Sequence, residues 1–288
     1  LARVPEYDAN AQARGLFRIA VGVAKKICIG DLLSTSIINR VFDNPERYSS
    51  IEVVIAVYAY AMKIYADFSG YSDIAIGSAA LFGYELPENF DAPYISRDLQ
   101  EFWRRWHISL STWLRDYLYI PLGGSRGSSW LTYRNLLITM LLGGLWHGAS
   151  WNFVIWGALH GVALAGTRMW QRSGRKFEMP AVLAVFLTFN YVCFAWIFFR
   201  APTFAHATLM LSRIGHLTAG TENISAKVIA VLVVAGIVHF IPRRWENILR
   251  DRFVVTPSLV QGILLAAAAY GVHLAAGAKA EPFVYGQF

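Results

Sequence analysis

The sequence predicts an all-α, polytopic integral membrane protein. Its 288 residues are 56% hydrophobic and only 16% charged, whereas a soluble domain usually carries about a quarter charged residues. Apolar runs recur along the chain, and arginine or lysine borders most of them, as is typical of membrane helices. The chain also contains 10 Trp, 14 Tyr and 18 Phe, and Trp and Tyr gather where helices leave the bilayer.

The net charge of +7 has the same explanation. The basic residues lie between apolar runs and form no continuous patch, so we interpret them as flanks of membrane segments and expect no nucleic-acid partner. Cys28 and Cys193 lie far apart in apolar surroundings and predict neither a disulfide framework nor a metal site. The first residues are polar rather than signal-like, and no Met opens the chain.

The first quarter of the chain predicts two helical regions. Residues 15–38 are apolar but interrupted by two lysines and an aspartate, which indicates an amphipathic, interfacial or buried helix. Residues 39–50 read as a polar loop. Residues 51–68 are a candidate span in which Lys63 needs a partner or a route to the interface. Residues 74–84 form a helix too short to span.

A polar motif, Asp67-Phe-Ser-Gly-Tyr-Ser-Asp73, separates those two apolar segments. Its two carboxylates flank a predicted turn at Ser69-Gly70, and in lipid they would be unsatisfied. We therefore expect them to face protein, water or a ligand. Asp67, Ser69 and Tyr71 are candidate substrate contacts.

After an ordered loop over residues 85–97, residues 100–120 are predicted to form one unusual helix. Five apolar side chains share one side of it at helical spacing: Trp103, Trp106, Leu110, Trp113 and Tyr117. Arg104, Arg105 and Arg115 are interleaved among them. The segment is either an interfacial helix anchored by Trp and Arg or a re-entrant wall that carries His107, Arg115 and Asp116 inward.

The rest of the chain supplies further predicted helices and an orientation. The expected spans are residues 135–146, 151–170, 180–199, 227–241 and 258–276, with a polar stretch over 201–226. Basic loops at 126–134, 168–176 and 243–252 are predicted to lie in the cytoplasm, with the C-terminus outside. Residues 135–146 are short, and either cross fully or break at Gly143-Gly144.

Five of the seven histidines have ordinary explanations. His206 and His216 lie in the polar stretch, and His239 and His273 lie near helix ends. His160 shares a helix stripe with Asn152 and Trp156, which favours a hydrogen bond between helices.

His147 and His107 differ because each lies in an aromatic cluster with hydroxyl or amide neighbours: Ser109 and Ser111 for one, Ser150 and Asn152 for the other. A neutral imidazole can take a proton from an alcohol as its oxygen attacks a carbonyl. The second imidazole or the Asn152 amide could orient the first or steady an oxyanion. Neither cluster offers Cys, Glu or HxxxH spacing for a metal, although Asp116 or Asp67 could add a ligand. No GxSxG motif supports a serine hydrolase.

Several of these motifs together resemble the membrane-bound O-acyltransferase family. They are the run from Glu101 to Tyr117, Tyr119-Ile-Pro-Leu-Gly-Gly124, Gly144-Leu-Trp-His147-Gly-Ala149, the Asp67 to Gly77 motif, and Pro87-Glu-Asn-Phe90. The Tyr-Ile-Pro-Leu-Gly-Gly run is similar to the alginate O-acetylation branch rather than the teichoic-acid D-alanylation branch.

The resemblance implies that His147 is the catalytic histidine and that His107 is the second active-site position. It also implies one helical membrane domain over residues 1–288, the C-terminal part of a longer protein, with re-entrant or interfacial helices around a central tunnel. The expected location is the bacterial inner membrane. The expected donor is acetyl-CoA or another acyl thioester, with no bound cofactor. The expected partners are the lipid bilayer, periplasmic SGNH-type acetyltransferases and the polysaccharide export machinery.

We therefore predict an acetyltransferase that serves an exported polysaccharide. Predicted donor or substrate contacts are Asp67, Ser69, Tyr71, Arg104, Arg105, Ser111, Arg115, Asp116 and Asn152, although Glu101 and Asp116 could instead pair with the arginines. Three alternatives stay open: a D-alanyl transferase, a transporter or channel with broken helices at Ser69-Gly70 and Gly143-Gly144, and a non-catalytic scaffold.

Overall fold

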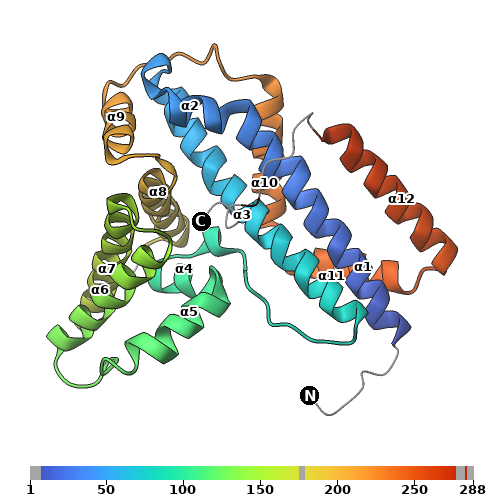
Figure 1. Cartoon of the computed structure of the whole chain (residues 1–288), viewed down its shortest axis with the longest axis horizontal. Helices are drawn as coiled ribbons and strands as arrows, with labels where there is room; N and C mark the ends of the chain where they lie inside the picture. Colours follow the sequence, from blue (N-terminus) through green and yellow to red (C-terminus); the bar gives the residue numbers. More distant parts are fainter. Residues whose placement is uncertain (1–7, 175–178, 277–282, 284–288) are drawn as a thin grey trace. The chain divides into compact units, whose positions relative to one another are not determined.

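The computed structural model describes residues 8–174, 179–276 and 283, and every regular element within these ranges is a helix (Figure 1). Contacts divide the chain into two compact units, each assembled from distant stretches. The first unit comprises Leu1–Asn39, Ala59–Glu88 and Ile224–Gln287; the second comprises Arg40–Tyr58, Asn89–Asn223 and Phe288. The single domain expected over residues 1–288 stays a prediction.

The N-terminal helical region is longer than the sequence predicted. Helix α1, Ala9–Ala24, continues through π-helical turns at Lys25–Asp31 and Ser34–Ile38 into α2, Asn39–Asp43. The predicted helix over 15–38 is therefore confirmed, but the polar loop begins only after Asp43 and contains one further 3₁₀ turn at Pro45–Arg47.

The turn predicted at Ser69-Gly70 is wrong, because α3 runs unbroken from Ser50 to Leu81. Gly70 serves close helix packing instead. A Cβ at Gly70 would lie 2.6 Å from the carbonyl oxygen of Gly22, and one at Gly77 would lie 2.6 Å from that of Gly15. Glycines thus bring the backbones of α1 and α3 into contact, as small residues do between membrane helices.

Three C-terminal helices complete the first unit: α10, Ala226–Phe240, α11, Arg243–Val254, and α12, Ser258–Ala275. The chain bends by 88° between α10 and α11, where Pro242 precedes the first turn of α11. The basic loop predicted over 243–252 is therefore a helix.

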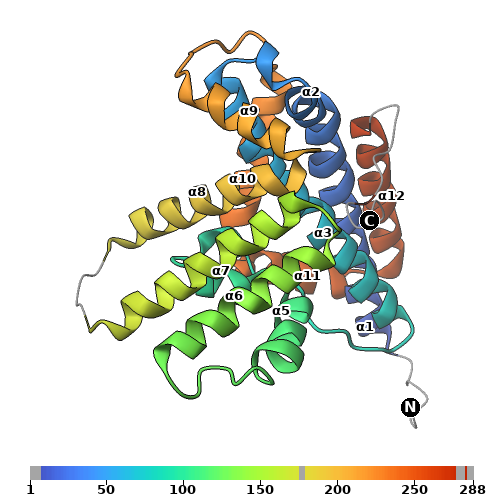
Figure 2. The same ribbon diagram turned by 60° about the vertical axis from the view of Figure 1, so that its left-hand side comes forward.

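The second unit contains α4, Leu99–Arg105, α5, Ile108–Leu114, a π-helical turn at Arg115–Tyr119, α6, Ser129–Trp146, α7, Trp151–Arg172, α8, Ala181–Arg200, and α9, Phe204–Gly215. Figure 2 shows α6, α7 and α8 side by side. The alternative of a break at Gly143-Gly144 is wrong, because α6 continues to Trp146. A Cβ at Gly144 would collide with the carbonyl of Phe153 on α7, and one at Gly157 with that of Met140 on α6.

Two described helices, α8 and α12, are long and apolar enough to cross a membrane, and the bent pair of α10 and α11 makes a third candidate. These agree with the predicted spans over 180–199 and 258–276. Helix α3 is long but carries buried Glu52, Lys63, Asp67 and Asp73. The total number of crossings, the orientation and the central tunnel stay predictions.

Candidate active site

The helix predicted over residues 100–120 is broken at its centre. Helix α4 ends at Arg105, Trp106 is extended, and His107 has left-handed backbone angles (φ 43°, ψ 57°) before α5 begins. Trp103 and Trp106 are buried, whereas Trp113 and Tyr117 are 55% and 70% exposed, so the predicted apolar stripe does not exist. The break lets the backbone pair with the preceding loop: Asp91 N donates to Arg105 O and Ile108 N to Asn89 O, both at 2.9 Å.

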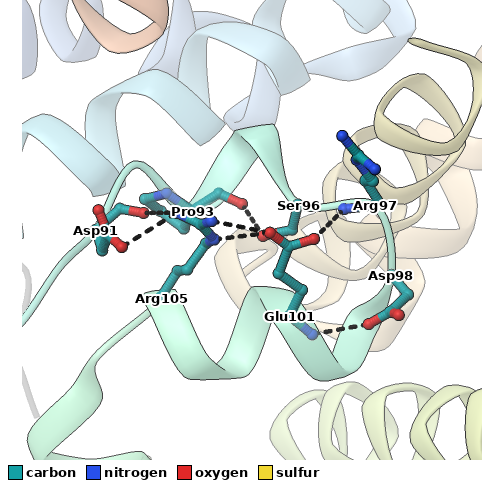
Figure 3. Close-up of polar contacts among 7 residues, drawn as sticks. All are labelled: Asp91, Pro93, Ser96, Arg97, Asp98, Glu101 and Arg105. Carbon is teal, nitrogen blue, oxygen red and sulfur yellow. Dashed lines mark hydrogen bonds and ion pairs between the residues drawn. The ribbon is translucent and has the colours of Figure 1, made fainter. Parts of the chain in front are cut away.

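Charged side chains hold this loop against α4 (Figure 3). The Arg105 guanidinium contacts the Asp91 carbonyl at 3.0 Å, the Asp91 carboxylate at 3.1 Å and the Glu101 carboxylate at 2.9 Å. Asp98 accepts from Glu101 N at 2.7 Å, and Glu101 accepts from Arg97 N at 2.8 Å. Asp98 thereby caps the start of α4, and Glu101 ties the preceding residue to the first turn. Arg105 is therefore engaged in positioning the loop, as the pairing alternative anticipated.

The other predicted donor contacts on this segment lie at the surface of the second unit. Arg104 is exposed. Arg115 and Asp116 are also exposed and pair with each other at 2.7 Å, so of the two alternatives the inward arrangement is not observed. The Arg115 hydrogen bond lowers the pKa of the Asp116 carboxyl. Ser111 Oγ donates to the Trp106 carbonyl at 3.0 Å, which satisfies the backbone at the break.

Asn89 contacts His107 directly, and the sequence interpretation assigned it no role. Its Oδ1 lies 3.2 Å from His107 Nδ1, 3.2 Å from Ser109 N and 2.9 Å from Ser109 Oγ. The signal was present in the Pro87-Glu-Asn-Phe90 motif, but nothing in the linear pattern relates residue 89 to residue 107. Only the loop geometry brings them together.

His147 lies where α6 ends and is 4% exposed. Gly148 follows with φ 150°, and Ser150 caps α7 by accepting from Asn152 N. The imidazole meets Trp156 and Phe199 edge to face at centroid distances of 5.2 and 5.0 Å. The tight connection between α6 and α7 thus places the imidazole in an aromatic enclosure formed with α8.

One face of α7 continues this enclosure with Asn152, Trp156 and His160, all buried. His160 Nδ1 accepts from Trp103 Nε1 at 3.2 Å, which confirms the predicted hydrogen bond between helices. Asn152 Nδ2 donates to the Ala201 carbonyl at 2.8 Å, so its amide ties α7 to the end of α8. Asn152 therefore lies beside the His147 connection with one of its two amide protons already used.

His107 is half-buried, and His147 is the neighbouring titratable group that acts on it within the second unit. Burial, and then the neighbouring His147, lower the pKa of His107 to about 3. His107 lies at the break between α4 and α5, outside the helices that could cross a membrane. It is therefore neutral at physiological pH, as a base that accepts a proton from an alcohol must be.

Asp67, Ser69 and Tyr71 belong to the first unit, whereas both histidines belong to the second. Asp67 is fully buried and paired with Lys26 at 2.9 Å and Lys63 at 3.3 Å. The predicted partner for Lys63 and the expectation that the carboxylates face protein are thus confirmed. Ser69 is buried, and Tyr71 is half exposed and stacked on Phe283. Substrate contact by these three residues stays a prediction.

Comparison with known proteins gives a consistent result. The sequence model of the membrane-bound O-acyltransferase family matches residues 3–201. The chain is 45% identical over 201 residues to a peptidoglycan O-acetyltransferase of Helicobacter pylori. This alignment covers 69% of the present chain and 38% of that protein. It is 49% identical over 189 residues to a probable alginate O-acetylase of Azotobacter vinelandii, covering 66% and 37%. A teichoic acid D-alanyltransferase of Bacillus subtilis is 29% identical over 227 residues, covering 70% and 54%.

The matched stretches thus cover well under half the length of the two acetylating relatives. The matched region contains α1 to α8 and both histidines.

Proposed function

Because this chain belongs to the membrane-bound O-acyltransferase family, we propose that it forms part of a membrane O-acetyltransferase that acts on an exported polysaccharide such as alginate. The observation that carries the proposal is the buried His147 in its aromatic enclosure, with the half-buried His107 as its electrostatic neighbour. The names of the acetylating relatives support the reaction class.

In the proposed reaction, the acceptor hydroxyl attacks the carbonyl carbon of an acyl thioester, acetyl-CoA being the expected donor. His147 takes the hydroxyl proton as general base, the C–S bond breaks, and the departing thiolate takes that proton from the His147 imidazolium, which restores the neutral base. A neutral imidazole in a water-poor enclosure suits this step, because its lone pair is available and a positioned base typically contributes about 10²- to 10⁴-fold.

The wider context is proposed on the same basis. The enzyme would lie in the bacterial inner membrane, take its donor from the cytoplasm and pass acetyl toward periplasmic SGNH-type partners and the export machinery. The acetyl acceptor could be the polysaccharide itself or such a partner.

D-alanyl transfer is a second candidate, since a D-alanyltransferase matches much of the chain, but at 29% identity rather than 45–49%. The transporter alternative has lost its structural motivation, because α3 and α6 are continuous at Ser69-Gly70 and Gly143-Gly144.

Replacing His147 tests the proposal. In the full-length protein in proteoliposomes, His147→Ala is expected to lower transfer of radiolabelled acetyl from acetyl-CoA roughly 10²- to 10⁴-fold. His273→Ala, which removes an exposed imidazole from α12, is the matched control. Full acetyl transfer by a normally folded His147→Ala protein would contradict the proposal, and transfer of D-alanyl instead of acetyl would favour the second candidate.

A further inference from the structure

The contacts of the Asn89 side chain determine which of its two terminal atoms faces His107. The backbone N–H of Ser109 lies 3.2 Å from Asn89 Oδ1 and can act only as a donor. The atom that it contacts must therefore be the amide oxygen and not the nitrogen. The Ser109 hydroxyl, 2.9 Å from the same atom, donates to it as well.

The orientation of Asn89 in turn determines the tautomer of His107. His107 Nδ1 lies 3.2 Å from the same Oδ1, which has no proton to give. A hydrogen bond across this distance therefore requires the proton to reside on Nδ1. The Ser109 hydroxyl, 3.3 Å from Nδ1, uses its proton toward Asn89 and presents a lone pair to Nδ1, which agrees with that assignment.

A neutral imidazole carries one proton, so a proton on Nδ1 leaves a lone pair on Nε2. Nε2 can then accept a hydrogen bond or a proton, but it cannot donate one. His107 is thereby unsuited to the oxyanion-stabilising role and suited to supporting a group that gains a proton.

We infer that Asn89 is a positioning residue that holds the proton of His107 on Nδ1, so that Nε2 serves as an acceptor in the acyl transfer. The role of Nε2 in acyl transfer rests on the proposed function, whereas the Nδ1 tautomer does not. Once His147 has taken the hydroxyl proton, an acceptor at His107 Nε2 would stabilise it, as an oriented second imidazole supports a general base.

The backbone around Asn89 is built to hold this geometry. Ile108 N donates to Asn89 O, Asp91 N donates to Arg105 O, and the Arg105 guanidinium bridges Asp91 and Glu101 (Figure 3). Phe90, next to Asn89, packs edge to face on Trp106, next to His107, with centroids 5.1 Å apart. Residues 89 and 107 are thus fixed relative to each other by their neighbours on both sides.

The tautomer can be measured without an activity assay. Full-length protein labelled with ¹⁵N-histidine is reconstituted in nanodiscs, and the His107 signals are identified by their loss in His107→Gln. In the wild type we expect a protonated Nδ1 and an unprotonated Nε2. In Asn89→Leu, which removes the acceptor, the Nε2-protonated form should appear, and acetyl transfer should fall roughly 10- to 100-fold, as is typical when the orienting partner of a functional histidine is lost.

Two further variants separate tautomer control from folding. Asn89→Asp keeps an acceptor for Ser109 N and His107 Nδ1, and should retain the Nδ1 proton while converting His107 to imidazolium at a higher pH than in the wild type. Asn190→Leu removes another asparagine acceptor of the second unit, the partner of the Tyr58 hydroxyl at 2.6 Å, and should leave the His107 signals unchanged.

An Nε2-protonated His107 in the wild type, or Nδ1 protonation that persists in Asn89→Leu, would overturn the inference. If the tautomer behaves as expected but wild-type protein transfers no acetyl group, the assignment of Asn89 stands and the proposed function fails.

Discussion

Two buried carboxylates of the first unit and two buried imidazoles of the second are accommodated in opposite ways. In the first unit, each carboxylate is paired with opposite charges: Asp67 with Lys26 and Lys63, and Asp73 with Arg18 at 3.0 Å and Lys25 at 2.7 Å. The second unit buries imidazoles among indole and phenyl rings, with Trp103 donating to His160 and with His147 enclosed by Trp156 and Phe199.

This difference separates a structural from a chemical use of burial. A buried ion is tolerable only when its partner is present, so Asp67 and Asp73 are already committed to their partners. An imidazole avoids that cost by staying neutral, since burial disfavours its charged form. It therefore keeps a lone pair for a reaction, as the candidate site in the second unit requires.

Breaking an ion pair of the first unit should have the largest effect on stability. Asp67→Ala leaves the ammonium groups of Lys26 and Lys63 without this carboxylate, and we expect a loss of about 3–5 kcal/mol in the free energy of unfolding. Unfolding in detergent micelles, followed by circular dichroism, measures it. Asp116→Ala removes an exposed pair and should cost at most about 1 kcal/mol. Equal losses in the two variants would show that the buried network is not essential.

Lowering the pH should weaken the region around His107 before it breaks the ion pair of Glu88. The pKa of His107 falls from an ordinary value of 6.5 to about 3 on folding, so the unfolded chain binds the proton more tightly. Above pH 6.5, His107 is neutral in both states and the free energy of unfolding does not depend on it. Below that pH, protonation of His107 in the unfolded chain lowers the free energy of unfolding by at most about 1.4 kcal/mol per pH unit. In the first unit, burial alone would raise the pKa of the Glu88 carboxyl. The hydrogen bond and charge of Arg18 outweigh burial and lower that pKa below its ordinary value of 4.5. The contribution of this carboxyl to stability is lost only below about pH 4.5.

Hydrogen exchange between pH 7 and pH 5 tests this order. Amides of α4 and α5 should lose protection before those of α1 around Arg18, which pairs with Glu88. His107→Gln should remove the difference. Earlier loss of protection around Arg18 would reverse the assignment.

A smaller effect concerns a feature that both units share, the crossing of two helices at glycine. Gly144→Ala on α6 should cost about 1–3 kcal/mol, because its methyl group meets the Phe153 carbonyl. Gly166→Ala lies within α7, has nothing within 4 Å, and should instead stabilise by up to about 1 kcal/mol through helix propensity. Thermal unfolding of both variants checks the sign, and a tolerated Gly144→Ala would refute the close crossing.

Much of the helical architecture was predictable, because apolar runs with polar ends specify helices locally. The predictions over 180–199 and 258–276 agree with α8 and α12 to within a residue or two. The errors occurred at glycines and at amphipathic stretches. Ser69-Gly70 and Gly143-Gly144 look like breaks in a linear reading, yet the glycines serve contacts with Gly22 and Phe153 that belong to other helices.

By itself, the sequence determined the membrane class, the family and the two histidines that stand out among seven. Composition and local motifs carry that information, since each depends on residues near one another along the chain. The tertiary structure alone decided that residues 100–120 break at His107, that Asp67 is committed to lysines and that Asn89 orients an imidazole eighteen positions away. Hydrogen bonds and ion pairs form between atoms that only folding brings within about 3 Å of each other, so no linear pattern specifies them.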